Sequence, residues 1–180
     1  MVLVICSLLY ILYLCAEYRY LKHERKKLKY LIHINGTRGK STLCRLVDAG
    51  LRGGGYKVFT KTTGTAPRII DVDAVEREIN RQGKANIREQ IKAVHWAVRQ
   101  NAEVLVVECM AVKPELQRIC EQRILTADIT AITNVREDHL DEMGASLDSI
   151  AHSLAQTIPT NAVFFTADAA YFPFFRQVCA

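Results

Sequence analysis

The sequence contains few of the residues that mark fibrous, disordered or disulfide-linked chains. Its 180 residues include only 9 glycines, 4 prolines and one tryptophan, and no internal repeat or low-complexity stretch is visible. Hydrophobic residues make up 49% and charged residues 24% of the chain. This composition excludes a collagen, a disordered tail and a small disulfide scaffold. The length suits one sizeable domain.

The cysteines lack the spacing of a metal or redox motif. None of the six forms a C-x-x-C pair, so neither a zinc site nor a dithiol motif is indicated. We expect them to be small hydrophobic residues in a reducing compartment. A broad basic face is missing as well, because the net charge of +5 resides mostly in residues 1–29, which hold six basic and two acidic residues. The nearly neutral remainder argues against a nucleic-acid-binding surface.

The N-terminal segment has the pattern of a membrane anchor. Within residues 1–16 only Ser7 falls outside the hydrophobic set, and continuing to residue 21 gives a helix of about 30 Å, which can span a bilayer. A basic run, KHERKK, follows at once and places the rest of the chain in the cytoplasm by the positive-inside rule. We therefore predict a single-pass anchor at 1–21, a basic juxtamembrane linker at 22–29 and a globular domain at 30–180.

Two other interpretations of this segment fit less well. A cleaved signal peptide would have a basic residue before the apolar run and a small-x-small cleavage site after it, and the sequence has neither. A core helix of a small domain would have one apolar face, whereas here the apolar residues run all round the helix and its flank is strongly basic.

The rest of the chain alternates strands and helices. Apolar runs predict strands at 31–35, 56–60, 104–109, 129–133 and 163–166, whereas residues 69–85 are ambiguous. Helical periodicity predicts helices at 42–52, 87–101 and 114–123, another beginning after Ser146, and a short one at the end. The fold class is therefore α/β, with a mostly parallel sheet covered by helices on both faces.

A glycine-rich turn between the first strand and the first of these helices is a candidate phosphate loop. Two glycines allow a tight turn whose amides face a phosphate, a lysine supplies positive charge, and a serine hydroxyl can bind Mg²⁺. The full pattern has a glycine where this chain has Ile34, and the alternative is an ordinary turn with a solvated lysine. The candidate nucleotide-binding residues are Asn35, Gly36, Thr37, Arg38, Gly39, Lys40, Ser41 and Thr42.

Two further polar groups follow predicted strands. Glu108 ends the strand VLVVE, at the sheet edge where ligands of open α/β folds bind, and could hold the same Mg²⁺ as Ser41. Its carboxylate could instead be satisfied by helix N-termini. The segment TNVREDHLD, residues 133–141, follows another strand and could hold a second cation through His139, or be a solvated acidic loop. His33, inside the first strand, is expected to be a core histidine.

These three motifs occur in the order and context of the Mur ligase superfamily, which the chain resembles over essentially its whole length. The segments NGTRGKST, KTTGTAPR, VECMAVKPELQ and NVREDHLDEMG, with the anchor, are most similar to the capsule-type branch formed by the B subunits of poly-γ-glutamate synthases. Members of that branch are much longer. The resemblance therefore implies a partial member with an incomplete central, ATP-binding domain of the P-loop type.

The resemblance implies an ATP-dependent acid–amino acid ligase that forms an amide bond. It would activate a carboxylate as an acyl phosphate and add glutamate in poly-γ-glutamate (capsule) biosynthesis, with ATP and Mg²⁺ as cofactors. Its partners would be the other membrane subunits of the synthase. The implied catalytic residues are Lys40, Glu108 and His139, the implied metal ligands Ser41, Glu108 and His139, and the weaker substrate contacts Thr63, Thr65 and Asn134.

One departure concerns the second metal. Cell-wall members of the superfamily carry a carbamylated lysine beyond the motif histidine, whereas this chain has no lysine from residue 145 to residue 180. His152 is the nearest substitute, although its position on its helix fits a solvated histidine better. The alternatives to the leading hypothesis are a catalytically silent nucleotide-binding subunit, a ligase of the cell-wall or folylpolyglutamate type and, less favoured, a phosphate-loop kinase.

Overall fold

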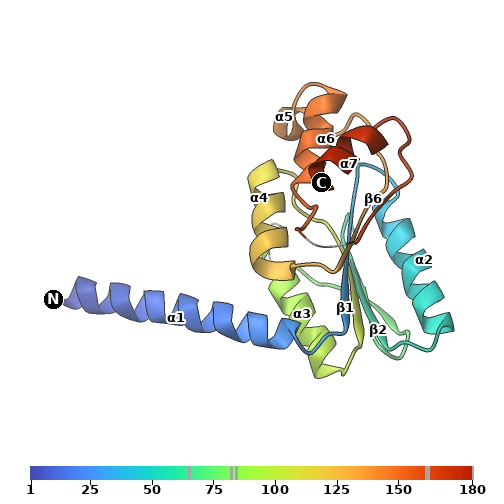
Figure 1. Cartoon of the computed structure of the whole chain (residues 1–180). Helices are drawn as coiled ribbons and strands as arrows, with labels where there is room; N and C mark the ends of the chain where they lie inside the picture. The colour runs from blue at the N-terminus through green and yellow to red at the C-terminus, as the bar shows by residue number, and fades with distance from the viewer. Residues whose placement is uncertain (65, 82, 84, 161–162, 180) are drawn as a thin grey trace.

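A mostly parallel sheet organises the chain (Figure 1). The computed structural model describes residues 1–64, 66–81, 83, 85–160 and 163–179. The strands lie in the order β4-β3-β2-β5-β1-β6-β7. Their bounds are β1 Tyr30–Asn35, β2 Val58–Thr62, β3 Arg68–Ile70, β4 Glu76–Glu78, β5 Val104–Glu108, β6 Ile129–Ile132 and β7 Val163–Thr166.

The central strands pair in parallel because crossover helices join them. β1 lies between β5 and β6, β2 pairs with β5, and β7 pairs with β6, all in parallel. Every residue of β2 and β5 is buried, as expected for strands covered on both faces. The predicted fold class is confirmed.

Helices cover both faces of this sheet (Figure 1). On one face, α2 packs Leu43, Val47 and Leu51 against Ile32, Ile34 and other residues of β1, β2 and β5. On the other face, α3 and the π-helical turn η1 pack against the opposite side chains of the same strands. The helices are α1 Val2–Arg25, α2 Lys40–Gly53, α3 Glu89–Arg99, α4 Pro114–Ile119, η1 Cys120–Leu125, α5 Leu140–Met143, α6 Leu147–Ala155 and α7 Phe172–Cys179.

A smaller core lies beyond the ends of β6 and β7. There α6 and α7 bury Ile150, Leu154 and Phe175 against Ile132. The helix predicted after Ser146 is α6, and Ser146 caps it: its hydroxyl accepts a hydrogen bond from the Ser149 amide at 3.1 Å. This core supports the segment that follows β6.

Three elements differ from the sequence-based expectation. β2 begins at Val58 and extends to Thr62, so that Lys61 is a strand residue. The helix predicted at 114–123 becomes α4 and then η1. The ambiguous stretch forms an antiparallel hairpin, β3–β4, whose short strands pair through the backbone and carry ion pairs such as Arg68–Glu76 instead of an apolar pattern.

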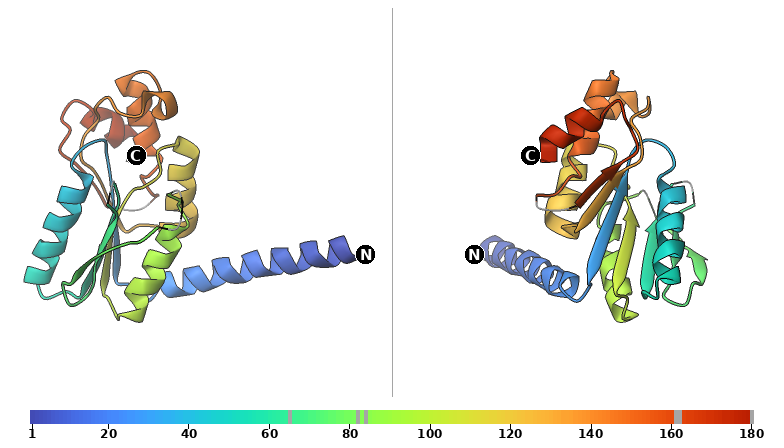
Figure 2. Two further views of the ribbon diagram at one scale, coloured as in Figure 1. Left: turned by 180° about the vertical axis from the view of Figure 1, so that it is seen from behind. Right: turned by 45° about the vertical axis from the view of Figure 1, so that its right-hand side comes forward.

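The first helix projects from the domain as a long rod (Figures 1 and 2). α1 is long and apolar enough to cross a membrane by length and composition, and its residues 2–16 are exposed. The helix continues through residues 22–25 of the predicted linker, and its last turns pack against α3 and η1, burying Leu21 and Glu24. Arg25 fixes this end by donating to the Leu125 carbonyl at 2.9 Å and to Asp128 Oδ2 at 2.6 Å.

Candidate functional site

The glycine-rich loop connects the buried end of β1 to the start of α2. Gly36 has a φ of 124° and Gly39 a φ of 80°, both in the region that disfavours side chains. A Cβ on Gly36 would lie 2.0 Å from Thr133 Oγ1. The loop can therefore approach β6 and still present the N-terminus of α2, which is a favourable place for a phosphate.

The Lys40 side chain folds back over this loop. Its Nζ atom donates to the carbonyl oxygens of Gly36 at 2.8 Å and Thr37 at 3.3 Å. These carbonyls hold the ammonium at the mouth of the loop, where it can neutralise a phosphate. The predicted role of Lys40 thus has a suitable geometry.

Glu108 lies next to the loop, at the end of the neighbouring strand β5. It is almost fully buried, and its Oε2 atom accepts hydrogen bonds from Ser41 Oγ at 2.7 Å and from the Thr63 amide at 2.8 Å. The ends of β1, β2 and β5 thereby converge, as the carboxyl edge of a parallel sheet requires. Thr63 reaches Glu108 through its backbone.

Thr133 and Asn134, which follow β6, clamp the loop from the other side. Asn134 Oδ1 accepts from Thr37 Oγ1 at 2.7 Å and from the Arg38 amide at 3.1 Å, and its Nδ2 donates to the Arg38 carbonyl at 3.0 Å. The same carbonyl accepts from Thr133 Oγ1 at 2.7 Å. Asn134 therefore positions the loop, a role that the sequence did not indicate.

His139 lies farther along the same segment, at the start of α5. Its φ of 46° is in the left-handed region, and 55% of its side chain is exposed. Its Nε2 atom is 3.9 Å from Asp138 Oδ1, and the same oxygen lies 3.8 Å from an Arg38 nitrogen. These loose contacts leave the imidazole able to reach a ligand.

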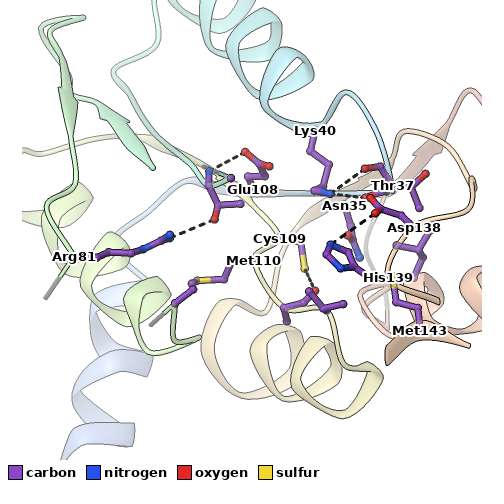
Figure 3. Close-up of a pocket in the computed structure, with 17 residues that line it drawn as sticks. Asn35, Thr37, Lys40, Arg81, Glu108, Cys109, Met110, Asp138, His139 and Met143 are labelled. Carbon is purple, nitrogen blue, oxygen red and sulfur yellow. Dashed lines mark hydrogen bonds and ion pairs between the residues drawn. The ribbon is translucent and has the colours of Figure 1, made fainter. Parts of the chain in front are cut away.

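The predicted catalytic residues line one cavity of 230 Å³ (Figure 3). Lys40, Glu108 and His139 all contribute to its wall, with Asn35, Gly36, Thr37 and Thr63. In Figure 3, Lys40 points into the space between Glu108 and the Asp138–His139 pair. The structure thus gathers residues from the three sequence motifs around a single space.

Other predicted residues lie less directly at this cavity. Asn35 lines it, but its amide donates to Gln117 Oε1 at 2.8 Å and Thr157 Oγ1 at 3.1 Å below the loop. Arg38, with 72% of its side chain exposed, and Thr42, on the exposed side of α2, are not among the described lining residues. Ser41 is connected to the cavity by its hydrogen bond to Glu108, which lines the cavity. Thr65 lies outside the described residues.

His152, weighed as a replacement for the missing lysine, is exposed on α6. Its Nδ1 atom is 2.8 Å from the Asp148 carbonyl oxygen, and its ring lies 4.5 Å from that of Phe174. Within the part of the chain that the structure describes, His152 is not a lining residue of the cavity. This placement agrees with a solvated histidine.

Sequence reasoning missed Arg81. This residue follows β4, lines the cavity opposite Lys40, and donates to Thr63 Oγ1 at 3.4 Å (Figure 3). It lies in the ambiguous stretch, which offered no periodic or motif signal. Only the hairpin brings it to the site.

A buried ion pair lies behind the loop. His33 of β1 has no exposed surface, and its Nδ1 atom is 2.7 Å from Glu121 Oε2. Burial by itself would lower the pKa of His33, but the neighbouring Cys109 thiol and Glu121 carboxylate raise this pKa to about 10. His33 is a core residue, as expected.

The donor set around Ser41 and Glu108 fits Mg²⁺. A hydroxyl and a carboxylate are hard oxygen ligands, and they lie in contact beside the phosphate-facing end of α2. No group of three or more His, Cys, Asp or Glu side chains suited to a metal occurs among the described residues. A metal bound here would therefore complete its shell with water and nucleotide phosphates, as Mg²⁺ commonly does.

Comparison with known families identifies the domain. The model of the Mur ligase middle domain matches residues 34–178. The chain belongs to the Mur ligase family. The match includes the glycine-rich loop, Glu108 and the segment that carries His139, so the cavity belongs to the middle domain of a Mur ligase.

Two curated proteins resemble this Mur ligase chain along nearly its whole length. "Capsule biosynthesis protein CapB" of Bacillus anthracis is 37% identical over 97% of the chain, and "PGA synthase CapB" of Bacillus subtilis (strain 168) is 38% identical over 98% of it. The chain spans 38% and 45% of the lengths of these relatives.

Solved structures of folate ligases share the fold. "E.coli FolC in complex with ADP, without folate substrate" superposes with a TM-score of 0.62 at 18% identity, covering 89% of this chain and 43% of that one. The "FPGS-AMPPCP-folate complex" gives a TM-score of 0.58 at 18% identity, covering 91% and 45%. At this identity the likeness concerns the fold alone.

Proposed function

We propose that this chain is the nucleotide-binding part of an ATP-dependent amide ligase that adds glutamate to a poly-γ-glutamate chain. The observation that carries the proposal is the Ser41–Glu108 contact of 2.7 Å, next to Lys40, in the cavity that His139 also lines. Membership of the Mur ligase family and the names of the two curated relatives support the reaction class and the polymer.

The proposed reaction has two steps. The terminal carboxylate of the acceptor attacks the γ-phosphorus of ATP, which forms an acyl phosphate and releases ADP. The amine of an incoming glutamate then attacks the acyl carbon, forms the amide and releases phosphate. Such chemistry depends mostly on positioning and charge neutralisation.

The residues of the cavity divide these tasks. The amides of Gly36 and Gly39 and of the first turn of α2 would hold the phosphates, because the Thr37 and Arg38 amides already donate to Asn134. Lys40 would neutralise charge that develops on the transferred phosphoryl group. Thr133 and Asn134 keep the loop in place through their bonds to Arg38.

The metal would be held by residues from two elements. Ser41 and Glu108 would bind Mg²⁺, and His139 would reach a second cation near the acceptor carboxylate. Bound Mg²⁺ supplies charge neutralisation and orientation of the phosphates.

We further propose that α1 anchors the domain to a membrane through the exposed part of the predicted anchor 1–21, with the globular part in the cytoplasm; Leu21, which packs against the domain, would lie outside the bilayer. Support comes from the exposure of the apolar residues 1–14 and from the basic residues 22–27 that follow. The partners would be the other membrane subunits of a poly-γ-glutamate synthase.

Binding of Mg·ATP to the detergent-solubilised chain tests the phosphate-loop assignment. Lys40→Ala removes a charge-assisted contact to phosphate, so we expect a loss of about 1.5–3 kcal/mol, roughly ten- to a hundredfold in affinity by calorimetry. Lys57→Ala is the matched control, because Lys57 is exposed and precedes β2 at the opposite edge of the sheet. Equal affinities for all three proteins would refute the assignment.

Turnover separates the ligase from a silent nucleotide-binding subunit. A complete chain with its partners should release phosphate and ADP only when glutamate and an acceptor are present. Release of AMP would refute the acyl-phosphate route, and tight ATP binding without turnover would favour the silent subunit.

A further inference from the structure

A second cavity lies beside the first, between β2, the residues after β4 and helix α3. Its volume is 480 Å³. We call it the basic pocket, because its wall includes Lys61, Arg81, Arg88 and Lys92 and, among the described lining residues, a single carboxylate, that of Glu89; Trp96 also contributes. None of the sequence motifs assigned to ATP lies in it.

The cations of this pocket are incompletely neutralised. Glu89 accepts from Arg81 Nε at 2.7 Å and from Arg81 Nη2 at 3.0 Å, and the same carboxylate is 3.5 Å from Lys61 Nζ. Lys61 has no exposed surface, so its ammonium has lost hydration and shares one carboxylate with a guanidinium. An added anion would stabilise both cations.

The pKa of Lys61 reflects this shortage of negative charge. Burial lowers its pKa, Glu89 raises it in part, and the neighbouring Arg81 lowers it again. At the rim, Lys92 is exposed and adds a further positive charge. Arg88 is paired with Glu17 of α1.

Arg81 connects the basic pocket with the catalytic cavity. It lines both spaces and donates to Thr63 Oγ1 at 3.4 Å, while the Thr63 amide donates to Glu108 at 2.8 Å. Figure 3 shows the Arg81 guanidinium pointing toward Glu108 from the side opposite Asp138 and His139. A ligand in the basic pocket would therefore have one end next to the metal-binding edge of the sheet.

We propose that the basic pocket binds the acceptor, a γ-linked polycarboxylate chain, with Arg81 directing its terminal carboxylate into the catalytic cavity. This inference rests on the proposed ligase function and names the site of its polymer substrate. Each residue inside such a chain carries a free α-carboxylate and no ammonium group. Repeated carboxylates match several cations spread over a pocket, and the methylene groups can pack on Trp96.

The same chemistry disfavours free glutamate as the occupant. Its ammonium would face the cations of Lys61, Arg81 and Lys92, and like charges at short range repel. A single glutamate also offers only two carboxylates, fewer than the cations of Lys61, Arg81, Arg88 and Lys92 in the described wall. The discrimination between polymer and monomer is therefore a property that can be measured.

The chain carries its own reporter for this measurement, because Trp96 is its single tryptophan and lines the basic pocket. Tetra-γ-glutamate is titrated into the whole 180-residue chain in detergent micelles while Trp96 fluorescence is followed. We expect saturable binding that weakens with added salt and exceeds the affinity for free glutamate at least tenfold.

Two variants locate the site. Lys92→Gln should weaken tetra-γ-glutamate about two- to fivefold, since Lys92 is exposed, and Arg81→Gln about tenfold or more. Arg99→Gln is the control, because Arg99 is an exposed cation on the same helix outside the pocket wall as described. Melting temperatures show which variants remain folded, and Lys92→Gln, at a solvent-exposed position, keeps the test valid if Arg81→Gln does not fold.

The outcomes separate this inference from the proposed function. Weaker binding to Lys92→Gln but not to Arg99→Gln, with unchanged affinity for a non-hydrolysable ATP analogue, supports the pocket. Equal oligomer binding to all variants, no oligomer binding at all, or equal affinities for oligomer and free glutamate would overturn it. If the oligomer binds as expected while the ATP analogue does not, the pocket stands and the phosphate-loop assignment fails.

Discussion

Replacing Gly36 by alanine tests the close packing of the glycine-rich loop against β6. A Cβ at this position would lie 2.0 Å from Thr133 Oγ1 and 2.8 Å from the Thr133 amide nitrogen. The threonine side chain could rotate away, but the backbone nitrogen belongs to a strand end that is hydrogen-bonded to Asn35 at 3.0 Å. The loop must therefore move to accept the methyl group.

Two effects set the size of the destabilisation. A side chain at a φ of 124° is strained by about 1–3 kcal/mol, and forcing an extra methyl group into a packed site costs about 1–3 kcal/mol more. Together they predict a loss of about 2–6 kcal/mol in the free energy of unfolding. For a chain of this size, 2 kcal/mol corresponds to about 4–8 °C in melting temperature.

The assay is thermal unfolding in detergent followed by circular dichroism, with Mg·ATP affinity measured in parallel. Gly50→Ala is the control, and it should change the free energy of unfolding in the opposite direction. Gly50 lies within α2 with open space around it, so alanine there should stabilise the helix by about 0.5–1 kcal/mol. We expect Gly36→Ala to melt lower and bind ATP more weakly. An unchanged melting temperature with normal affinity would refute the packing argument.

Two further predictions concern groups that support the loop. Asn134→Ala removes the bonds to Thr37 and Arg38, so ATP affinity should fall about three- to tenfold in calorimetry while helix content stays the same; normal affinity would mean that the clamp does not position the loop. His33 has a pKa raised to about 10 by its buried partners, against an ordinary value near 6.5, so its contribution to stability is complete below about pH 6.5 and is lost as the pH rises through 10. The melting temperature should therefore decline between pH 7 and pH 10 more steeply in the wild type than in His33→Gln, and parallel curves would contradict the pairing with Glu121.

The sequence was sufficient where a local pattern had one physical solution. The apolar run at 104–109 could only be a buried strand, and the glycine-rich turn between a strand and a helix could only face the carboxyl edge of the sheet. The contact between Ser41 and Glu108 followed from that rule, since both residues lie at this edge on neighbouring elements. His33 was expected in the core and is there.

The hairpin and the basic pocket were beyond sequence reasoning. β3 and β4 have only three residues each and no apolar alternation; backbone pairing and the turn at Asp71 hold them. Arg81 follows this hairpin, so its approach to Thr63 depends on a long-range fold rather than on its neighbours. Lys61 was placed outside a strand because the sequence predicted this strand at 56–60, whereas β2 runs from Val58 to Thr62.

Sequence alone therefore determined the α/β class, the apolar N-terminal helix and the three motifs, because each depends on residue types at short spacing. Tertiary structure decided which groups meet. It made Asn134 a clamp on the loop, left His152 in solvent, and brought Lys61 of β2, Arg81 of the segment after β4 and Glu89 of α3 together. The physical reason is that burial and charge sharing depend on packing between distant segments, and no local pattern encodes that packing.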